Sequence, residues 1–140
     1  MPLPITGDGK MTRDFTFVMD IVTALMQAGF TEKAIGEEIN IASANEIEIL
    51  HLAEIINKLT ENKSGIIYKN RRKWDTKSRL LASIDRAKKL LGYEPQTSFE
   101  EGILKTVQWF KLNWDSINRD AEFPPGMSSA VNNLVVRENL

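Results

Sequence analysis

The segment GDGKMTRDFTFVMDIV, residues 7–22, combines a glycine turn, an arginine and an alternation of aromatic residues that leads into a helical pattern. Residues 3–6, which precede the glycine turn, predict a strand that enters it. Residues 13–18 alternate as in a half-buried strand, with Phe15 and Phe17 on one face. The segment therefore predicts two short strands followed directly by a helix, which indicates a mixed fold.

Four stretches of the chain have the apolar spacing of amphipathic helices. Asp20 is predicted to be the N-cap of the first helix, and Gly29 to stop it. Ser83 is predicted to cap the third helix, and Ser98 with Glu101 forms a capping box for the fourth. We expect helices over residues 20–28, 48–60, 83–91 and 98–113, with a further turn or two after the last.

Two further short strands complete the expected fold. Residues 38–41 and 65–68 each predict a strand, and prolines break the chain near its C-terminus. We expect an α/β (α+β) fold over residues 1–118, a small mixed domain of short strands and about four amphipathic helices. Residues 119–140 are expected to form an irregular tail that docks or swaps, in which 134–136 could be a strand or a docking segment.

The composition excludes several classes of protein. The chain of 140 residues has no cysteine, so disulfides, cysteine–zinc sites and thiol nucleophiles are excluded. No apolar run reaches the ~18–20 residues of a membrane span, and the N-terminus lacks the pattern of a signal peptide. We therefore expect a cytoplasmic protein that does not enter a membrane. The net charge of −1 argues against a general nucleic-acid binder.

A local basic cluster contrasts with this nearly neutral total. Residues 69–79 contain six lysines and arginines against Asp75 alone, a net charge of +5, so the remaining residues carry −6. Such a cluster on an acidic background suggests a specific anion site. Arg13 in the first segment and Arg72 in the cluster can converge on one dianionic group, because the planar guanidinium fork suits phosphate oxygens. A ligand that contains a diphosphate is the first hypothesis.

Simpler explanations exist for these residues. Arg13 could pair with Asp14 or Asp20 at the end of its strand. His51, the only histidine, is expected at the surface or boundary of its helix, and no metal site is expected. Residues 70–74 could contact nucleic acid, which the acidic remainder of the chain disfavours. The other cations are expected to be solvated loop charges, namely Lys69, Lys73, Lys77 and Arg79.

Four motifs follow one another along the chain. They are GDG, TRDF and FVMDIV within residues 7–22, RRxxD over 71–75, AKKLLGYxP over 87–95, and SxEEGI with TVxWF over 98–110. In this order they resemble the C-terminal, substrate-binding part of NAD-dependent nucleotide-sugar epimerases and dehydratases. These enzymes are extended short-chain dehydrogenases/reductases, including those similar to UDP-glucose 4-epimerase. The resemblance covers roughly residues 3–112.

The resemblance implies a substrate site made of three residues. In the family, the arginine of the first motif contacts the diphosphate, which corresponds to Arg13, and the second arginine of the basic loop holds phosphate oxygens, which corresponds to Arg72. The aspartate of that loop binds the ribose, which corresponds to Asp75. The implied ligand is a nucleoside diphosphate sugar, such as a UDP-sugar. The chain departs from the family at Trp74, usually glycine, and at residues 40–44, NIASA for NIGxG, where the tight glycine geometry is expected to be lost.

The catalytic motifs of the family have no counterpart in this sequence. Family catalysis lies in an N-terminal Rossmann domain with a glycine-rich turn and a Tyr-x-x-x-Lys pair. Here the Gly7-x-Gly9 turn opens no βαβ unit, and Tyr68 and Tyr93 are followed at the fourth position by arginine and threonine. We therefore expect no catalytic residue and no bound NAD in this chain, although NAD serves the complete family enzyme.

Two functions from different classes fit these observations. The first is a nucleotide-sugar-binding lobe that is inactive alone and needs the missing Rossmann domain or a partner chain. The alternative is a non-enzymatic module derived from that lobe, which self-associates or binds a partner. Loss of the Rossmann domain would expose apolar surface, so we expect a homodimer or larger assembly, with exchange of the tail as one route.

Overall fold

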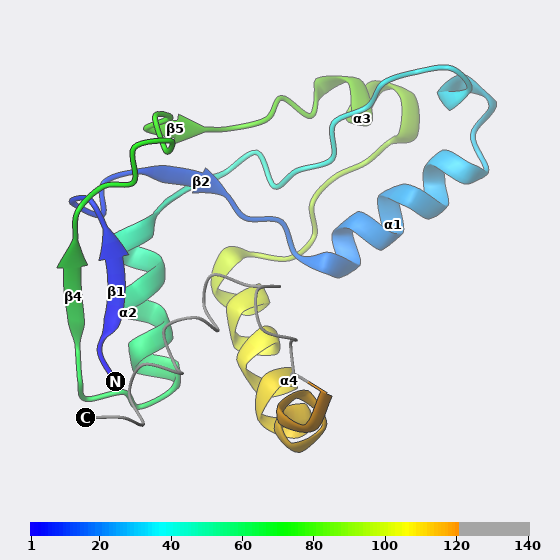
Figure 1. Ribbon diagram of the computed structural model, residues 1–140. Coiled ribbons are helices and arrows are strands. Elements are labelled where there is room, and N and C mark those ends of the chain that lie inside the picture. The colour runs from blue at the N-terminus through cyan, green and yellow to red at the C-terminus, as the bar shows by residue number, and fades with distance from the viewer. Residues whose placement is uncertain (121–140) are drawn as a thin grey trace. The chain divides into compact units, whose positions relative to one another are not determined.

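The computed structural model describes residues 1–120 as short strands and four α-helices (Figure 1). The chain divides into two compact units, Met1–Val107 and Gln108–Leu140. The elements in chain order are β1 (Leu3–Thr6), β2 (Thr12–Asp14), α1 (Val18–Gly29), the 3-10 turn η1 (Glu32–Ala34), β3 (Glu46–Glu48), α2 (Ile49–Leu59), β4 (Ile66–Lys69), β5 (Arg79–Leu80), α3 (Asp85–Leu91) and α4 (Phe99–Asp120). The expected small α/β fold is confirmed.

The strands form two small sheets that are linked by the connection between β1 and β2. In the first sheet β1 lies parallel to β4, and α2 contacts β1 (Figure 1). In the second sheet β2 is central, antiparallel to β3 and parallel to β5. Because β4 pairs with β1 and β5 pairs with β2, the basic loop of residues 70–78 starts near the end of β1 and ends near β2.

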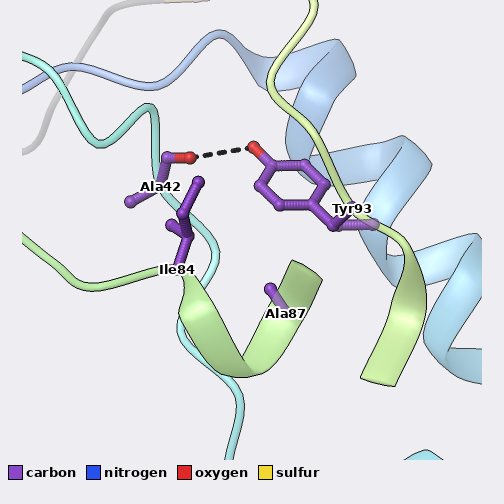
Figure 2. Close-up of a cluster of buried hydrophobic side chains, with 5 residues drawn as sticks. Ala42, Ile84, Ala87 and Tyr93 are labelled. Atoms are coloured by element: carbon purple, nitrogen blue, oxygen red, sulfur yellow. Dashed lines mark hydrogen bonds between the residues drawn. The ribbon is translucent and has the colours of Figure 1, made fainter. Parts of the chain in front are cut away.

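A small apolar core forms where α1, α3 and the segment around Ala42 meet. Tyr93 is its largest fully buried side chain, at 1% exposure, and its hydroxyl donates a hydrogen bond of 3.0 Å to the carbonyl oxygen of Ala42 (Figure 2). Ile84 and Ala87 lie beside the tyrosine ring (Figure 2), and Ala24 of α1 completes the cluster. Burial raises the pKa of the Tyr93 phenol, and nearby acidic side chains add to this shift.

Asp20 is not the N-cap of α1, so that prediction was wrong. The helix begins at Val18, with Phe17 in the capping position, and Asp20 is buried in the first turn. Its carboxylate accepts hydrogen bonds from the backbone N–H of Thr97 at 3.1 Å and from its hydroxyl at 3.2 Å. Asp20 therefore forms hydrogen bonds with Thr97, which is 77 residues further along the chain, instead of capping its own helix.

The predicted strand over residues 13–18 is also shorter than expected. Strand β2 covers Thr12–Asp14 only, because its neighbours β3 and β5 offer only three and two residues for pairing. The alternation of aromatic residues reflects side-chain packing, since the ring of Phe15 lies 5.7 Å from that of Phe99.

Residues 38–41 do not form the predicted strand. Ile39 and Ile41 pack against the core without a strand partner, and the strand of this region is β3, at Glu46–Glu48. Strand β5, which pairs with β2, was not predicted, because two residues carry no periodic signal.

The predicted helix ends are confirmed in part, because Gly92 ends α3 but the N-cap of α3 is Ile84 and not Ser83. Gly92 ends α3 in the left-handed conformation, with φ of 68°, and the Ser83 hydroxyl accepts from the N–H of Asp85 at 3.3 Å. Half of the capping box of α4 is present. Ser98 accepts from the N–H of Glu101 at 3.2 Å, while the Glu101 carboxylate pairs with Lys105.

Helix α4 covers Phe99–Asp120, which confirms the further turns that were expected after residue 113. The expected boundary at residue 118 falls within this helix, and the rest of the expected tail lies outside the described residues. None of the helices in residues 1–120 has the length and apolar character needed to cross a membrane.

Candidate functional site

Arg13 lies at the centre of the second sheet, where three acceptors hold its guanidinium. Nη1 donates to the carbonyl oxygen of Thr12 at 2.7 Å. Nη2 donates to a carboxylate oxygen of Asp75 at 3.1 Å and to the carbonyl oxygen of Lys77 at 3.2 Å. The side chains of Arg13 and Asp75 are only 20% and 19% exposed. The structure therefore brings together two of the three predicted site residues, 62 positions apart in the sequence.

The alternative pairing of Arg13 with Asp14 or Asp20 is wrong. The Asp14 carboxylate instead accepts hydrogen bonds from the turn at Ser43 and Ala44, and Asp20 accepts from Thr97. Arg13 pairs with Asp75 because of the strand order. Strand β5 pairs with β2, so the loop that precedes β5 and contains Asp75 lies next to Arg13.

A tight turn carries Asp75. Its N–H donates to the carbonyl oxygen of Arg72 at 3.1 Å, and its own carbonyl oxygen accepts from Nε of Arg71 at 2.9 Å. The third predicted site residue, Arg72, is exposed, and its guanidinium lies 5.2 Å from the centre of the Trp74 ring. Trp74 does not adopt a left-handed conformation, so this turn forms without a glycine there.

A groove of about 390 Å³ opens beside Arg13. This volume falls within the roughly 300–1,000 Å³ of small-molecule sites. Arg13 and Asp14 form the charged part of its lining, and the rest is mostly apolar. The other lining residues are Thr16, Ile41, Ala42, Leu80, Leu81 and Ala82.

The turn at residues 42–44 borders this groove and keeps a glycine-like geometry. We expected its tight conformation to be lost with the family glycines, but Ala44 has φ of 55°, in the left-handed region. The Asp14 carboxylate holds the turn by accepting from the N–H of Ser43 at 3.0 Å, from its hydroxyl, and from the N–H of Ala44 at 3.1 Å.

Arg79 is not a solvated loop charge, and in this respect the prediction was wrong. It lies in β5 and forms an ion pair of 2.6 Å with Glu46 of β3, on the two edges of the second sheet. Hydrogen bonds from Arg79 and from Thr12 hold the pKa of the Glu46 carboxyl below its ordinary value. Sequence reasoning missed this cross-sheet pair, because neither short strand was expected. The three lysines of the cluster, Lys69, Lys73 and Lys77, are exposed.

His51 lies at the boundary of α2, as expected. Its side chain is half exposed, its ring is 6.1 Å from that of Phe99, and Nε2 is 3.9 Å from a carboxylate oxygen of Glu100. Within residues 1–120 no group of three or more histidine or acidic side chains is arranged to hold a metal ion.

The comparisons with known proteins agree on one family. Residues 1–106 match the family model described as GDP-mannose 4,6 dehydratase. UDP-glucuronate 4-epimerase of Thermodesulfobacterium geofontis is 40% identical over 118 residues, which are 83% of this chain and 35% of that protein.

Solved structures give the same result. An epimerase from Methanothermobacter thermautotrophicus is 55% identical with a TM-score of 0.84, over 86% of this chain and 36% of that one. UDP-glucuronic acid 4-epimerase from Bacillus cereus, solved with UDP-glucuronic acid and NAD, is 30% identical with a TM-score of 0.72, over 79% of this chain and 35% of that one.

The chain thus spans about a third of the length of the relatives that it matches. It belongs to the family of NAD-dependent epimerases and dehydratases, the extended short-chain dehydrogenases/reductases.

Proposed function

We propose that this chain is a nucleotide-sugar-binding lobe of an NAD-dependent sugar epimerase or dehydratase. Arg13 and Arg72 bind the diphosphate of a UDP-sugar, and Asp75 accepts a hydrogen bond from the ribose. The contact of 3.1 Å between Asp75 and Arg13 carries this proposal; Arg13 lines the groove, whereas Asp75 and Arg72 are outside its lining. The structure of the Bacillus cereus relative with UDP-glucuronic acid and NAD supports the class of ligand.

Arg13 and Arg72 differ in burial, so each would contribute to diphosphate binding in a different way. Arg13 is largely buried and held by two backbone carbonyls, so its orientation is set before a ligand arrives. Arg72 is exposed on the turn and contributes a permanent charge that a phosphate oxygen can approach.

The glycine turn after β1 does not fit the diphosphate of NAD. In dinucleotide-binding folds a glycine-rich turn leads from a strand into a helix, whose N-terminus faces the phosphates. Here Gly7 and Gly9 lead from β1 into β2. We therefore place the cofactor and the sugar chemistry in another segment or another chain.

Calorimetric titration of UDP into the purified chain tests the proposal. We expect saturable binding that weakens about 10- to 100-fold in Arg72→Ala, the range for a lost hydrogen bond to a charged group. Lys73→Ala is the matched control, because it removes an exposed cation from the neighbouring position. Equal losses in both variants would indicate a diffuse charge effect, and absence of binding up to millimolar UDP would refute the proposal.

A turnover assay addresses the second part of the proposal. Incubation of the isolated chain with NAD and UDP-sugars is expected to give no epimerised or dehydrated product. Measurable conversion would overturn the assignment of the chemistry to another part of the enzyme.

The exposed face of α1 favours a second candidate function, a self-associating or partner-binding module. One side of this helix packs inward through Asp20 and Ala24. The opposite side exposes five large apolar side chains at helical spacing, Val18, Met19, Val22, Leu25 and Met26. Proteins usually cover a contiguous apolar surface of this kind.

Light scattering at high protein concentration tests this candidate. We expect a homodimer that Leu25→Glu dissociates, while Leu112→Glu, the same change at an exposed position of α4, leaves it intact. A monomer at all concentrations would count against self-association through α1.

A further inference from the structure

The arginines around the basic loop are held in different ways. Three acceptors hold the guanidinium of Arg13, and Nε of Arg71 donates to the carbonyl oxygen of Asp75 at 2.9 Å. Within residues 1–120 the guanidinium of Arg72 makes no hydrogen bond and no ion pair. Its central carbon instead lies 5.2 Å from the centre of the Trp74 ring. The orientation of Arg72 therefore depends on contact with an aromatic ring.

The main chain beneath this contact is fixed by other groups. The N–H of Asp75 donates to the carbonyl oxygen of Arg72 at 3.1 Å, and the N–H of Thr76 donates to that of Trp74 at 3.1 Å. The Asp75 carboxylate ties the turn to Arg13 of β2. None of these bonds uses the side chain of Arg72 or of Trp74. Either side chain can therefore be replaced while the turn keeps its hydrogen bonds.

Stacking on an aromatic ring suits an arginine that binds an anion. The face of a tryptophan ring attracts a cation, and the attraction is modest at an exposed site such as Trp74, which is 74% exposed. The guanidinium is planar, and its five N–H groups lie in that plane, so contact through one face leaves them available to an acceptor. A phosphate oxygen then meets donors that are already oriented, and less side-chain freedom is lost on binding.

We propose that Trp74 is a positioning residue, which holds Arg72 in the orientation that binds a phosphate group. This inference rests on the proposed nucleotide site and adds a residue to it. Trp74 acts through the guanidinium of Arg72 and does not itself contact the ligand.

The test is calorimetric titration of UDP into a set of variants at fixed ionic strength. Trp74→Leu removes the aromatic ring and keeps an apolar side chain, and Trp74→Phe keeps a ring. Trp74→Leu is also combined with Arg72→Ala. Trp114→Leu is the matched control, because it makes the same change at another exposed tryptophan, in α4.

We expect Trp74→Leu to weaken UDP binding about two- to tenfold, the range for the cost of ordering one long side chain. Trp74→Phe should recover part of this loss, because a phenylalanine ring attracts a cation less strongly than a tryptophan ring does. In the Arg72→Ala background Trp74→Leu should cause no further loss, because no guanidinium remains to be oriented. Trp114→Leu should leave the affinity unchanged.

The outcomes separate this inference from the proposed function. If Arg72→Ala weakens UDP binding but Trp74→Leu does not, positioning by Trp74 is refuted and the nucleotide site stands. The same conclusion follows if Trp74→Phe recovers nothing. It also follows if the loss in Trp74→Leu persists in the Arg72→Ala background, because Trp74 would then act on the ligand or on the turn without Arg72. If the wild type binds no UDP, or if Arg72→Ala binds it equally well, both are refuted.

Discussion

Replacement of Ala44 by glycine is expected to stabilise the fold. Ala44 holds φ of 55°, where the Cβ of an L-residue is unfavourable, and its side chain is exposed, so no packing is lost when the methyl group is removed. The left-handed conformation costs about 1–2 kcal/mol for a residue with a Cβ. Glycine loses about 0.5–1 kcal/mol more backbone entropy on folding. The net expectation is a gain of about 0.5–1 kcal/mol.

Urea unfolding and thermal unfolding of the variant measure this gain. A change of this size corresponds to an increase of about 1–4 °C in the melting temperature of a chain of this length. Ala28→Gly is the control, because it makes the same atomic change inside α1, where the left-handed region is not used. It should destabilise by about 1 kcal/mol.

A melting temperature of Ala44→Gly that is unchanged or lower would refute the argument. It would mean that the three hydrogen bonds accepted by Asp14 do not hold the turn in the left-handed conformation. A gain would show that Ala44 holds a backbone conformation that favours glycine, at a turn where the family has glycines. Loss of those glycines would then not indicate a decayed site.

Three further predictions concern buried and paired side chains. Tyr93→Phe should cost about 1–3 kcal/mol of unfolding free energy, because the buried carbonyl of Ala42 loses its donor; urea unfolding measures it. Because the pKa of Tyr93 is raised in the folded state, its contribution to the free energy of unfolding is complete below about pH 10 and is lost as the pH rises through the native pKa. The stability of Tyr93→Phe should therefore decline less steeply above pH 10 than that of the wild type. The pKa of Glu46 is lowered in the folded state, mainly by the hydrogen bond from Arg79. The contribution of Glu46 to the free energy of unfolding is therefore present above about pH 4.5 and is lost as the pH falls through the native pKa. Glu46→Gln should therefore be less sensitive to acid than the wild type in unfolding measured from pH 7 to pH 3, and equal sensitivity would contradict the pairing.

Local sequence signals predicted the helices well. Gly92 ends α3, and Ser83 and Ser98 satisfy N–H groups at the starts of α3 and α4. These signals work because a cap and its helix lie within four residues of each other, so the chain forms the contact whatever the rest of the fold does. Asp20 shows the limit, because its best donors belong to Thr97 and become available only after folding.

The amino-acid sequence was enough to select the residues of the candidate site and to propose a class of ligand for them. Arg13, Arg72 and Asp75 could be selected from charge, spacing and family motifs. Which of them touch was decided by tertiary structure, because Arg13 meets Asp75 only when β5 pairs with β2. Pairing of strands this short leaves no periodic pattern in the sequence, since it depends on contacts between residues more than 60 positions apart. The same pairing of β3 and β5 with β2 brings Arg79 into contact with Glu46, and it brings Asp75 of the basic loop into contact with Arg13.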